Sequence, residues 1–316
     1  MSTETQLPAE RRTARPRRPR QSLGQRKETR FAWSVVSPAT IIVIAVIIVP
    51  VLWNTVLAFQ DVSFRDLADG RMTGSFTLEN FLDALTSSGF WQSLRVTVVY
   101  SVASTLGSVL VGLLAALVFR KAFPGRGVFR AIMLLPYVAP VVAVTFVWTT
   151  MLNPQYGIVN YYGTRWLGWD QAIDFLGRSP YALLTVIGIE IWRYFPFAFM
   201  FLTARVGALP GDIEEAALVD GVTPLQNFRF IVLPQLMPTI ALLTVLRLIM
   251  TFNKFDDVFL LTGGSAGTEV AAVRVYTQLM GSFNIGGAAA TALVMAAILG
   301  IFLVFYMRLT AKTEEA

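Results

Sequence analysis

The sequence predicts an all-α integral membrane protein with six transmembrane helices, because of its composition and the grouping of its apolar residues. Of 316 residues, 55% are hydrophobic and only 15% are charged. Such a chain is too apolar for an ordinary soluble domain. Its apolar residues form runs of about 20 or more, and a helix of that length crosses a hydrocarbon core about 30 Å thick.

Six segments meet this length requirement. Three of them contain no charged residue, the fourth and fifth are interrupted by ionisable residues, and the sixth is again uncharged. In chain order the predicted spans cover residues 31–60, 96–119, 131–152, 181–204, roughly 239–261 and 286–307.

Basic residues predict the orientation, since short loops rich in Lys and Arg stay on the cytoplasmic side of a membrane. Nine of the 26 Lys and Arg residues lie within the first thirty residues, and the loops 61–95, 153–180 and 262–285 are poorer in them. Both termini and the connections after the second and fourth spans are therefore predicted to be cytoplasmic. Further basic residues on that side are Arg120, Lys121, Arg126, Arg130, Arg205, Arg229, Arg308 and Lys312.

The predicted organisation is a six-helix domain, 31–310, between the tails 1–30 and 311–316. The Arg- and Pro-rich stretch 11–20 cannot bury a core, so 1–30 is expected to be a disordered cytoplasmic tail. Because this tail flanks the first membrane helix, its charge favours a role in topology or contact with anionic lipid over nucleic-acid binding. The first apolar run is too long for a cleaved signal peptide, and no small-residue cleavage site follows it.

Missing residue types exclude several classes of chemistry. The chain has no Cys and no His, which excludes disulfides, thiolate nucleophiles, imidazole bases and the usual zinc sites. None of the lysines follows a glycine, so the phosphate-binding Gly-Lys-Ser/Thr loop is missing as well. We expect a transport protein that is not an enzyme, hydrolyses no ATP itself and binds no cofactor.

Two stripes of small residues predict close helix packing. One lies on the second span at four-residue spacing and the other on the sixth, and small side chains let two backbones approach each other in a membrane. The stripes consist of Ser104, Ser108, Gly112 and Ala116, and of Ala292, Ala296 and Gly300.

The cytoplasmic connection 205–236 predicts two short helices. Asp212 and Glu215 have the spacing of a capping box at a helix start, and Gly221 suits the left-handed conformation that often ends a helix. Thr223 can cap a second helix with Pro224 at its first position, and this helix is expected to end near residue 234.

The first of these helices has the composition of a docking surface. Ala216 and Ala217 leave the backbone accessible to another protein, and Glu215 and Asp220 place charge beside them. The alternative is a polar hairpin that only connects two spans.

A longer pattern in the same connection indicates a family. Glu-Ala-Ala, three residues, Gly, nine residues and Ile-x-Leu-Pro resembles the signature loop of the permease subunits of binding-protein-dependent ABC importers. This resemblance implies that the first helix is a coupling helix, which sits in a cleft of a cytoplasmic ATPase subunit. The matching residues are Glu215, Ala216, Ala217, Gly221, Ile231, Leu233 and Pro234, with Asp220 beside them.

The resemblance also implies partners and a location. It implies a second, homologous permease, two ATPase subunits that bind ATP and Mg, an extracytoplasmic sugar-binding protein or lipoprotein, and a multi-pass position in the bacterial inner membrane. Residues 135–140, 192–196 and 255–264 are similar to runs in the carbohydrate branch, including the maltose permeases. The maltose subunit has extra helices and a large extracytoplasmic domain that this chain lacks, so the shorter trehalose and oligosaccharide permeases fit better. A di- or oligosaccharide of the trehalose or maltose type is the expected substrate.

Ionisable residues inside the predicted spans indicate a lined cavity, since they are costly beside lipid. Glu190 and Arg193 share a face of the fourth span, and Arg247, Thr251 and Lys254 share a face of the fifth. The alternative is structural: Glu190 pairs with Arg193 or Arg247 as a buried strut.

Aromatic residues near these charges suit a sugar, whose C–H faces stack on rings while its hydroxyls bond to polar groups. The family resemblance implies that the substrate path uses the matching positions here, although several residue types, notably the charged ones, differ from the maltose permease. These positions are Tyr137, Glu190, Trp192, Arg193, Tyr194, Phe197, Arg247, Thr251 and Lys254.

Three other functions remain open from the sequence. An importer of glycerol phosphate or a polyol would use the basic residues to hold an anion. An ion-coupled secondary carrier would use Glu190 and Arg193 as its coupling pair, but the sequence has no internal repeat that supports it. A membrane scaffold or sensor would carry no solute.

Overall fold

The computed structural model describes residues 23–71 and 74–314, which fall into two units divided between Asn54 and Thr55. The first unit contains α1 (Leu23–Val43), a π-helical segment η1 (Ile44–Ile48) and the start of α2 (Val49–Ala58). Residues 23–30 are thus helical, whereas the sequence predicted a disordered tail to residue 30; the rest of that prediction lies outside the described residues.

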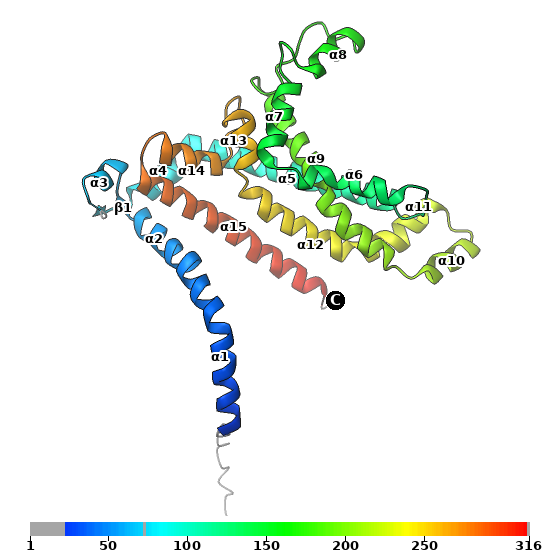
Figure 1. The fold of residues 1–316 in the computed structure, drawn as a ribbon, viewed down its shortest axis with the longest axis horizontal. Helices are drawn as coiled ribbons and strands as arrows, with labels where there is room; N and C mark the ends of the chain where they lie inside the picture. The colour runs from blue at the N-terminus through cyan, green and yellow to red at the C-terminus, as the bar shows by residue number, and fades with distance from the viewer. Residues whose placement is uncertain (1–22, 72–73, 315–316) are drawn as a thin grey trace, which may run out of the picture. The chain divides into compact units, whose positions relative to one another are not determined.

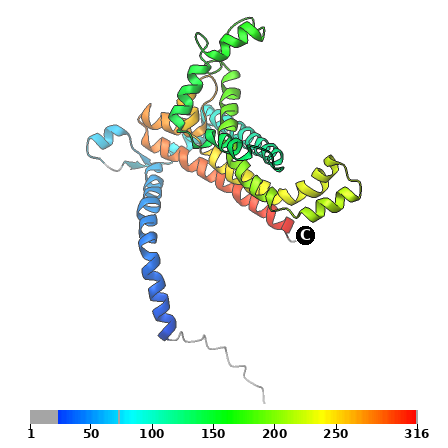
Figure 2. The same cartoon turned by 45° about the vertical axis from the view of Figure 1, so that its right-hand side comes forward.

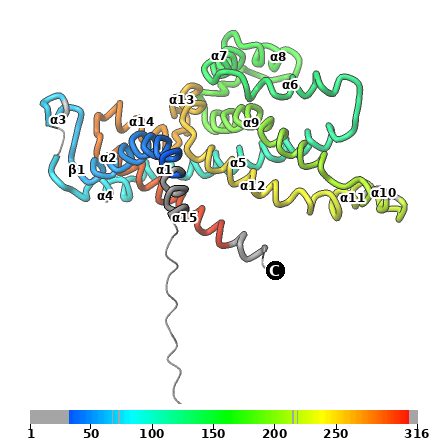
Figure 3. Tube along the Cα trace, turned by 60° about the horizontal axis from the view of Figure 1, so that its bottom comes forward, coloured from blue at the N-terminus to red at the C-terminus, as the bar shows by residue number. Residues whose placement is uncertain are grey.

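The second unit is a helical bundle with one small hairpin, in which Gln60 pairs with Phe76 and Asp61 with Ser75. Its elements are β1 (Gln60–Asp61), α3 (Phe64–Ala68), β2 (Ser75–Phe76), α4 (Glu79–Thr86), α5 (Ser88–Val118), α6 (Arg126–Val138), α7 (Val141–Met151), α8 (Ile158–Trp166), α9 (Tyr181–Gly207), α10 (Gly211–Val219), α11 (Pro224–Asn227), η2 (Phe228–Val232), α12 (Leu233–Phe252), α13 (Asp256–Thr262), α14 (Ala271–Met280) and α15 (Ile285–Glu314). Within this unit α5, α9 and α12 run side by side, with α10 and α11 at one end and α4 and α14 at the other (Figures 1 and 3).

Among the described residues, five helices are long and apolar enough to cross a membrane, and a bent pair makes a sixth if it counts as one span. The bent pair is α6 and α7, which meet at 93° where the sequence predicted one straight span over 131–152. Proline explains the bend: Pro140 has no amide hydrogen, and its ring pushes Ala139 into an extended conformation. Figure 2 shows α7 turning away from α6.

The fifth span also differs from its prediction. The helix begins at Pro224 and continues through η2 and α12 to Phe252, so it does not end near Pro234. The π-helical segment Phe228–Val232 ends two residues before Pro234, which has no amide hydrogen for the ordinary α-helical hydrogen bond to the Phe230 carbonyl. Residues 256–261, predicted to belong to this span, lie in the separate helix α13.

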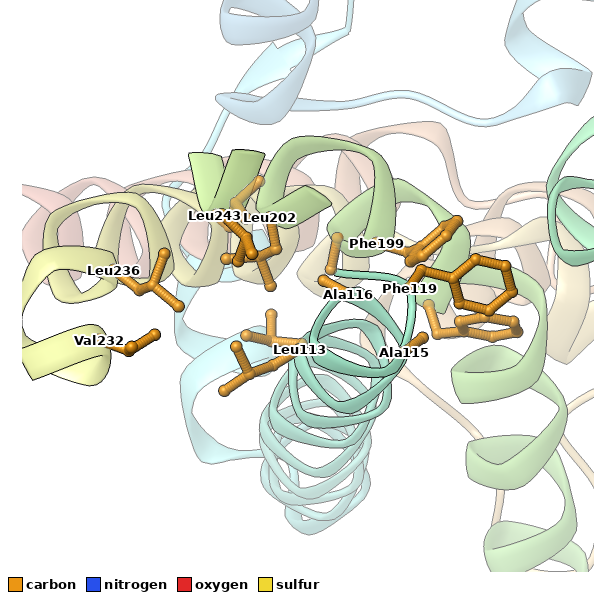
Figure 4. Packing of buried hydrophobic residues seen from close by; sticks show 13 residues of the cluster. Leu113, Ala115, Ala116, Phe119, Phe199, Leu202, Val232, Leu236 and Leu243 are labelled. Carbon is orange, nitrogen blue, oxygen red and sulfur yellow. The ribbon is translucent and has the colours of Figure 1, made fainter. Parts of the chain in front are cut away.

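The main core lies between α5, α9 and α12. The predicted stripe on α5 is buried against α9, and at Gly112 a Cβ atom would lie 2.6 Å from Ala198 Cβ and 2.8 Å from the Phe199 amide nitrogen. Apolar side chains from all three helices, including Leu113, Leu202 and Leu243, fill the space around this contact (Figure 4). The stripe on the second span therefore packs two helices closely, as the sequence predicted.

The stripe on the sixth span behaves differently. Ala296 on α15 is exposed, and a Cβ at Gly300 would meet no atom within 4 Å. The buried residues of α15 lie earlier, at Ala288, Ala290 and Met295, where the helix packs on α4 and α14. The prediction that Ala292, Ala296 and Gly300 form an interface is thus not met within this chain. The helix continues to Glu314 and so includes residues 311–314 of the predicted C-terminal tail.

Candidate transport site and coupling loop

A buried ion pair joins the fourth and fifth spans. Arg247 Nη2 on α12 donates to Glu190 Oε1 on α9 at 2.9 Å, and the two side chains are 1% and 0% exposed. Of the two partners that the sequence left open for Glu190, the structure selects Arg247. An isolated buried charge is strongly unfavourable, so this pair holds α9 and α12 in register.

A second group of charges surrounds Asp257 on α13. Its carboxylate accepts from Arg193 of α9, and its other oxygen lies 2.7 Å from Lys254 Nζ. Arg193 Nη2 also lies 3.5 Å from the carbonyl oxygen of Ala139, at the bend between α6 and α7. Asp257 therefore connects α9, the end of the fifth span and, through Arg193, the bent pair.

Tyr194 links the two groups into one. The ring centroid lies 4.2 Å from Arg247 Cζ, 4.4 Å from Lys254 Nζ and 5.3 Å from Arg193 Cζ, and Lys254 Nζ donates to the phenol oxygen. Cations are attracted to the face of an aromatic ring. We call Glu190, Arg193, Arg247, Lys254 and Asp257 the ion cluster; with three basic and two acidic members, it has a formal charge of +1.

Three half-buried rings adjoin the ion cluster and form what we call the aromatic face: Tyr137 of α6 with Tyr194 and Phe197 of α9. The Tyr137 centroid lies 5.8 Å from that of Tyr194 and 6.1 Å from that of Phe197. Trp192 is not part of this face; it lies 5.4 Å from Trp148 of α7. Thr251 is buried, and its hydroxyl has no hydrogen-bond partner among the described residues.

The structure thus brings most of the predicted substrate-path residues together, but at different depths. Glu190, Arg247 and Thr251 are buried in this conformation, whereas Tyr194 and Lys254 are partly accessible. Asp257 is a member of the ion cluster that sequence reasoning missed. The available signal for Asp257 was an acidic residue in an apolar run, three positions after Lys254.

The loop with the Glu-Ala-Ala pattern folds as two helices. Gly221 has a left-handed φ of 77°, and Val222 N–H donates to the Ala217 carbonyl at 3.0 Å, which is the expected glycine-terminated helix end. The start differs slightly: α10 begins at Gly211, so Asp212 lies inside the first turn and not at the cap. The side chain of Glu215 lies outside what the structure describes.

The second helix begins as predicted. Thr223 Oγ1 accepts from the Gln226 amide, and Gln226 Oε1 accepts from the Thr223 amide at 2.9 Å, with Pro224 at the first helical position. This capping box satisfies two backbone amides at the start of the fifth span.

Three large apolar side chains are exposed on α10 and at the start of the fifth span. Val219 is 88% exposed, Leu225 74% and Phe230 67%, and we call these three residues with Ala216 the coupling surface. Beside it lies a pocket of about 380 Å³ lined by Asp220, Gly221, Val222, Gln226, Phe230 and Ile231. Of the other predicted residues, Ala217 is buried, Leu233 is half-buried and Pro234 is exposed. Val219 lies on α10, outside the fifth span, and an exposed apolar side chain at such a place is typical of a contact with another protein. Leu225 and Phe230 lie in the first turns of the fifth span.

A family comparison covers the helices that carry the ion cluster and those that carry the coupling surface. The sequence profile of the family described as the binding-protein-dependent transport system inner membrane component matches residues 108–314, which is more than half of the chain. The chain belongs to this family. It is therefore a permease, a transport component and not an enzyme, and a multi-pass protein of the inner membrane.

Similar permeases include three with informative names. The inner membrane ABC transporter permease protein YcjO of Escherichia coli is 31% identical over 85% of this chain and 90% of its own length. The trehalose/maltose transport system permease protein MalF of Thermococcus litoralis is 31% identical, over 83% and 88%. The sn-glycerol-3-phosphate transport system permease protein UgpA of Agrobacterium fabrum is 31% identical, over 82% and 89%.

The permease fold also matches a solved structure. A chain of the bacterial alginate ABC transporter, in complex with an alginate pentasaccharide-bound periplasmic protein, superposes with a TM-score of 0.79 over 91% of this chain and 96% of that chain. At 22% sequence identity, this match supports the fold alone.

Proposed function

We propose that this permease is a transmembrane subunit of an ATP-driven importer and forms part of the path for a di- or oligosaccharide of the trehalose or maltose type. The observation that carries the proposal is the half-exposed aromatic face beside Lys254 and Arg193, at the level where α9 and α12 are joined. Rings can stack on the C–H faces of a sugar while charged groups bond to its hydroxyls. The name of the trehalose/maltose relative supports this substrate class.

The second part of the proposal concerns how ATP hydrolysis by partner subunits drives the permease. The permease would receive motion from ATPase subunits through α10, because the coupling surface is apolar and exposed and lies at a turn with a capped helix end and a capped helix start. The working complex would contain a second, homologous permease, two ATPase subunits that bind ATP and Mg, and an extracytoplasmic sugar-binding protein. The family description and the periplasmic protein bound to the alginate transporter support these partners.

The orientation belongs to the same proposal. Both termini and the coupling surface would face the cytoplasm, and the described domain would span the membrane from about residue 31 to residue 310. The excess of basic residues in 120–130 and at both ends supports this arrangement.

One observation favours a second candidate substrate, a small phosphate ester or other anion. The ion cluster has a formal charge of +1, and Lys254 is its most accessible member, with 15% of its side chain exposed. The name of the glycerol-phosphate relative points the same way. In this case the extra cation would hold the substrate anion.

Uptake into vesicles distinguishes these substrates. The permease is reconstituted with the subunits that copurify with it and with the binding protein, and uptake of labelled trehalose, maltose and glycerol 3-phosphate is measured with and without ATP. We expect ATP-dependent uptake of a disaccharide. Uptake of the phosphate ester alone would support the second candidate, and uptake driven by a pH gradient without ATP would contradict the importer.

A further inference from the structure

A groove of about 510 Å³ lies between α6 and α9, near the end of α9 that leads into the coupling loop. Arg130 and Thr203 contribute the polar part of its lining, and Leu134, Met200 and Ala204 contribute apolar or small walls. The groove therefore combines a positively charged group with apolar walls. Its lining residues belong neither to the aromatic face nor to the coupling surface.

The charge at the groove is uncompensated. Arg126 lies one turn before Arg130 on the same face of α6, and in the described part of the chain neither has an acidic partner. The Nε atoms of both, and the Thr203 hydroxyl, are shielded from solvent without a hydrogen-bond partner among the described residues. The sequence contains no acidic residue over 84–169 or over 191–211, the stretches that include α6 and the part of α9 at the groove.

Aromatic contacts surround the α5–α6 turn that precedes the two arginines. The Phe119 ring lies 5.4 Å from Phe123 and 5.3 Å from Phe199, and Phe123 lies 6.1 Å from Phe129. Phe199 also lines the groove, and Figure 4 shows it beside Phe119. This chain of rings links the α5–α6 turn, which directly precedes Arg126, to α9.

We propose that this groove is a binding site for an anionic phospholipid, with the phosphate against Arg126 and Arg130 and an acyl chain along Leu134 and Met200. Guanidinium groups bind phosphate oxygens in a bidentate manner. Basic pockets between membrane helices on the cytoplasmic side bind anionic lipid head groups, and this is the side that the basic residues predict to be cytoplasmic.

Membrane topology alone does not account for this arrangement. The positive-inside rule explains why basic residues are frequent in this connection, but those residues could all point into water. Here Arg130 lines a largely apolar groove and Arg126 lies one turn before it, and the Nε atom of each is shielded from solvent without a hydrogen-bond partner among the described residues. The apolar walls also favour a lipid over free phosphate, which would leave them uncovered.

Lipid binding to the purified transporter tests the proposal. The full chain, with its copurifying subunits, is placed in nanodiscs or detergent, and native mass spectrometry measures binding of phosphatidylglycerol against phosphatidylcholine. We expect the wild type to retain phosphatidylglycerol, and Arg126→Gln/Arg130→Gln to bind it about thirtyfold more weakly, since each basic group near a membrane contributes a factor of about five. Equal retention of both lipids by the wild type would overturn the proposal.

Two matched variants distinguish lipid binding in this groove from non-specific electrostatic attraction of anionic lipid to the protein. Arg165→Gln/Arg178→Gln removes the same charge from the segment between the third and fourth spans and should leave lipid retention unchanged. Ala204→Phe keeps both arginines but fills the groove, and it should lose the lipid as well. Retention of phosphatidylglycerol by Ala204→Phe or by the Arg126/Arg130 double variant would contradict the site. If the double variant does not assemble, Arg126→Lys/Arg130→Lys keeps the charge and should retain the preference.

Discussion

Glu190 and Arg247 are 57 residues apart in the chain, yet Arg247 Nη2 lies 2.9 Å from Glu190 Oε1 inside the bundle. Both side chains are buried, so the pair acts as a strut between α9 and α12 in this conformation. The accessible part of the candidate site lies next to it, at Tyr194 and Lys254. We therefore propose a structural role for this pair and a transport role for its more accessible neighbours, Tyr194 and Lys254.

Breaking this ion pair on one side should destabilise the permease strongly. Arg247→Met leaves the Glu190 carboxylate buried and unpaired, and we expect a loss of about 3–5 kcal/mol in the free energy of unfolding. Denaturant titration in detergent, followed by tryptophan fluorescence, measures this loss. The control is Glu190→Gln/Arg247→Met, which leaves neither position of the pair charged and should lose much less. Equal losses in the single and double variants would contradict the role of the pair.

The contact at Gly112 should tolerate no side chain. In Gly112→Ala the new Cβ would overlap Ala198 Cβ and the backbone of Phe199, so α5 and α9 must separate, at a cost of about 1–3 kcal/mol. The matched control is Gly188→Ala on α9, where a Cβ would meet no atom within 4 Å. Thermal unfolding of the two variants should show a lower midpoint for Gly112→Ala only; a similar shift in both would argue against close packing at Gly112.

The Tyr194 ring should contribute to substrate affinity. Tyr194→Leu removes one ring of the aromatic face, and we expect the KM for sugar uptake to rise about twofold to tenfold, because an aromatic contact contributes about 0.5–1.5 kcal/mol. Tyr194→Phe keeps the ring and loses only the hydrogen bond from Lys254, so its KM should change less. Tyr181→Leu, at the start of α9, is the positional control. An unchanged KM in Tyr194→Leu would place the sugar elsewhere.

The left-handed conformation of Gly221 should matter for energy coupling. A Cβ at this position meets no atom within 4 Å, so Gly221→Ala acts through backbone strain of about 1–2 kcal/mol and should disturb the turn between α10 and α11. We expect less sugar transported per ATP hydrolysed, with normal insertion. Gly221→Asn, which tolerates this conformation, should be closer to wild type. Normal coupling in Gly221→Ala would indicate that the turn geometry is not needed.

The sequence by itself determined the features that depend on near neighbours along the chain. The lengths of the apolar runs determined that the protein is a bundle of membrane helices, because transfer into lipid depends on each segment's own composition. Thr223 with Gln226, and Gly221, identified a helix start and a helix end, because caps are made by residues three to five positions apart. The Glu-Ala-Ala pattern identified the family for the same local reason.

Only the tertiary structure decided which charges meet. Glu190 had one candidate partner three residues away and another on a different span, and helix spacing could not choose between them. Asp257 joined the site because α13 separates from the fifth span after Phe252, a break that the apolar run 239–261 did not reveal. The sequence did not reveal the bend at Pro140 either, because residues 131–152 also form one apolar run. Burial of a charge is decided by what surrounds it in space, and those surroundings come from helices that are far apart in the sequence.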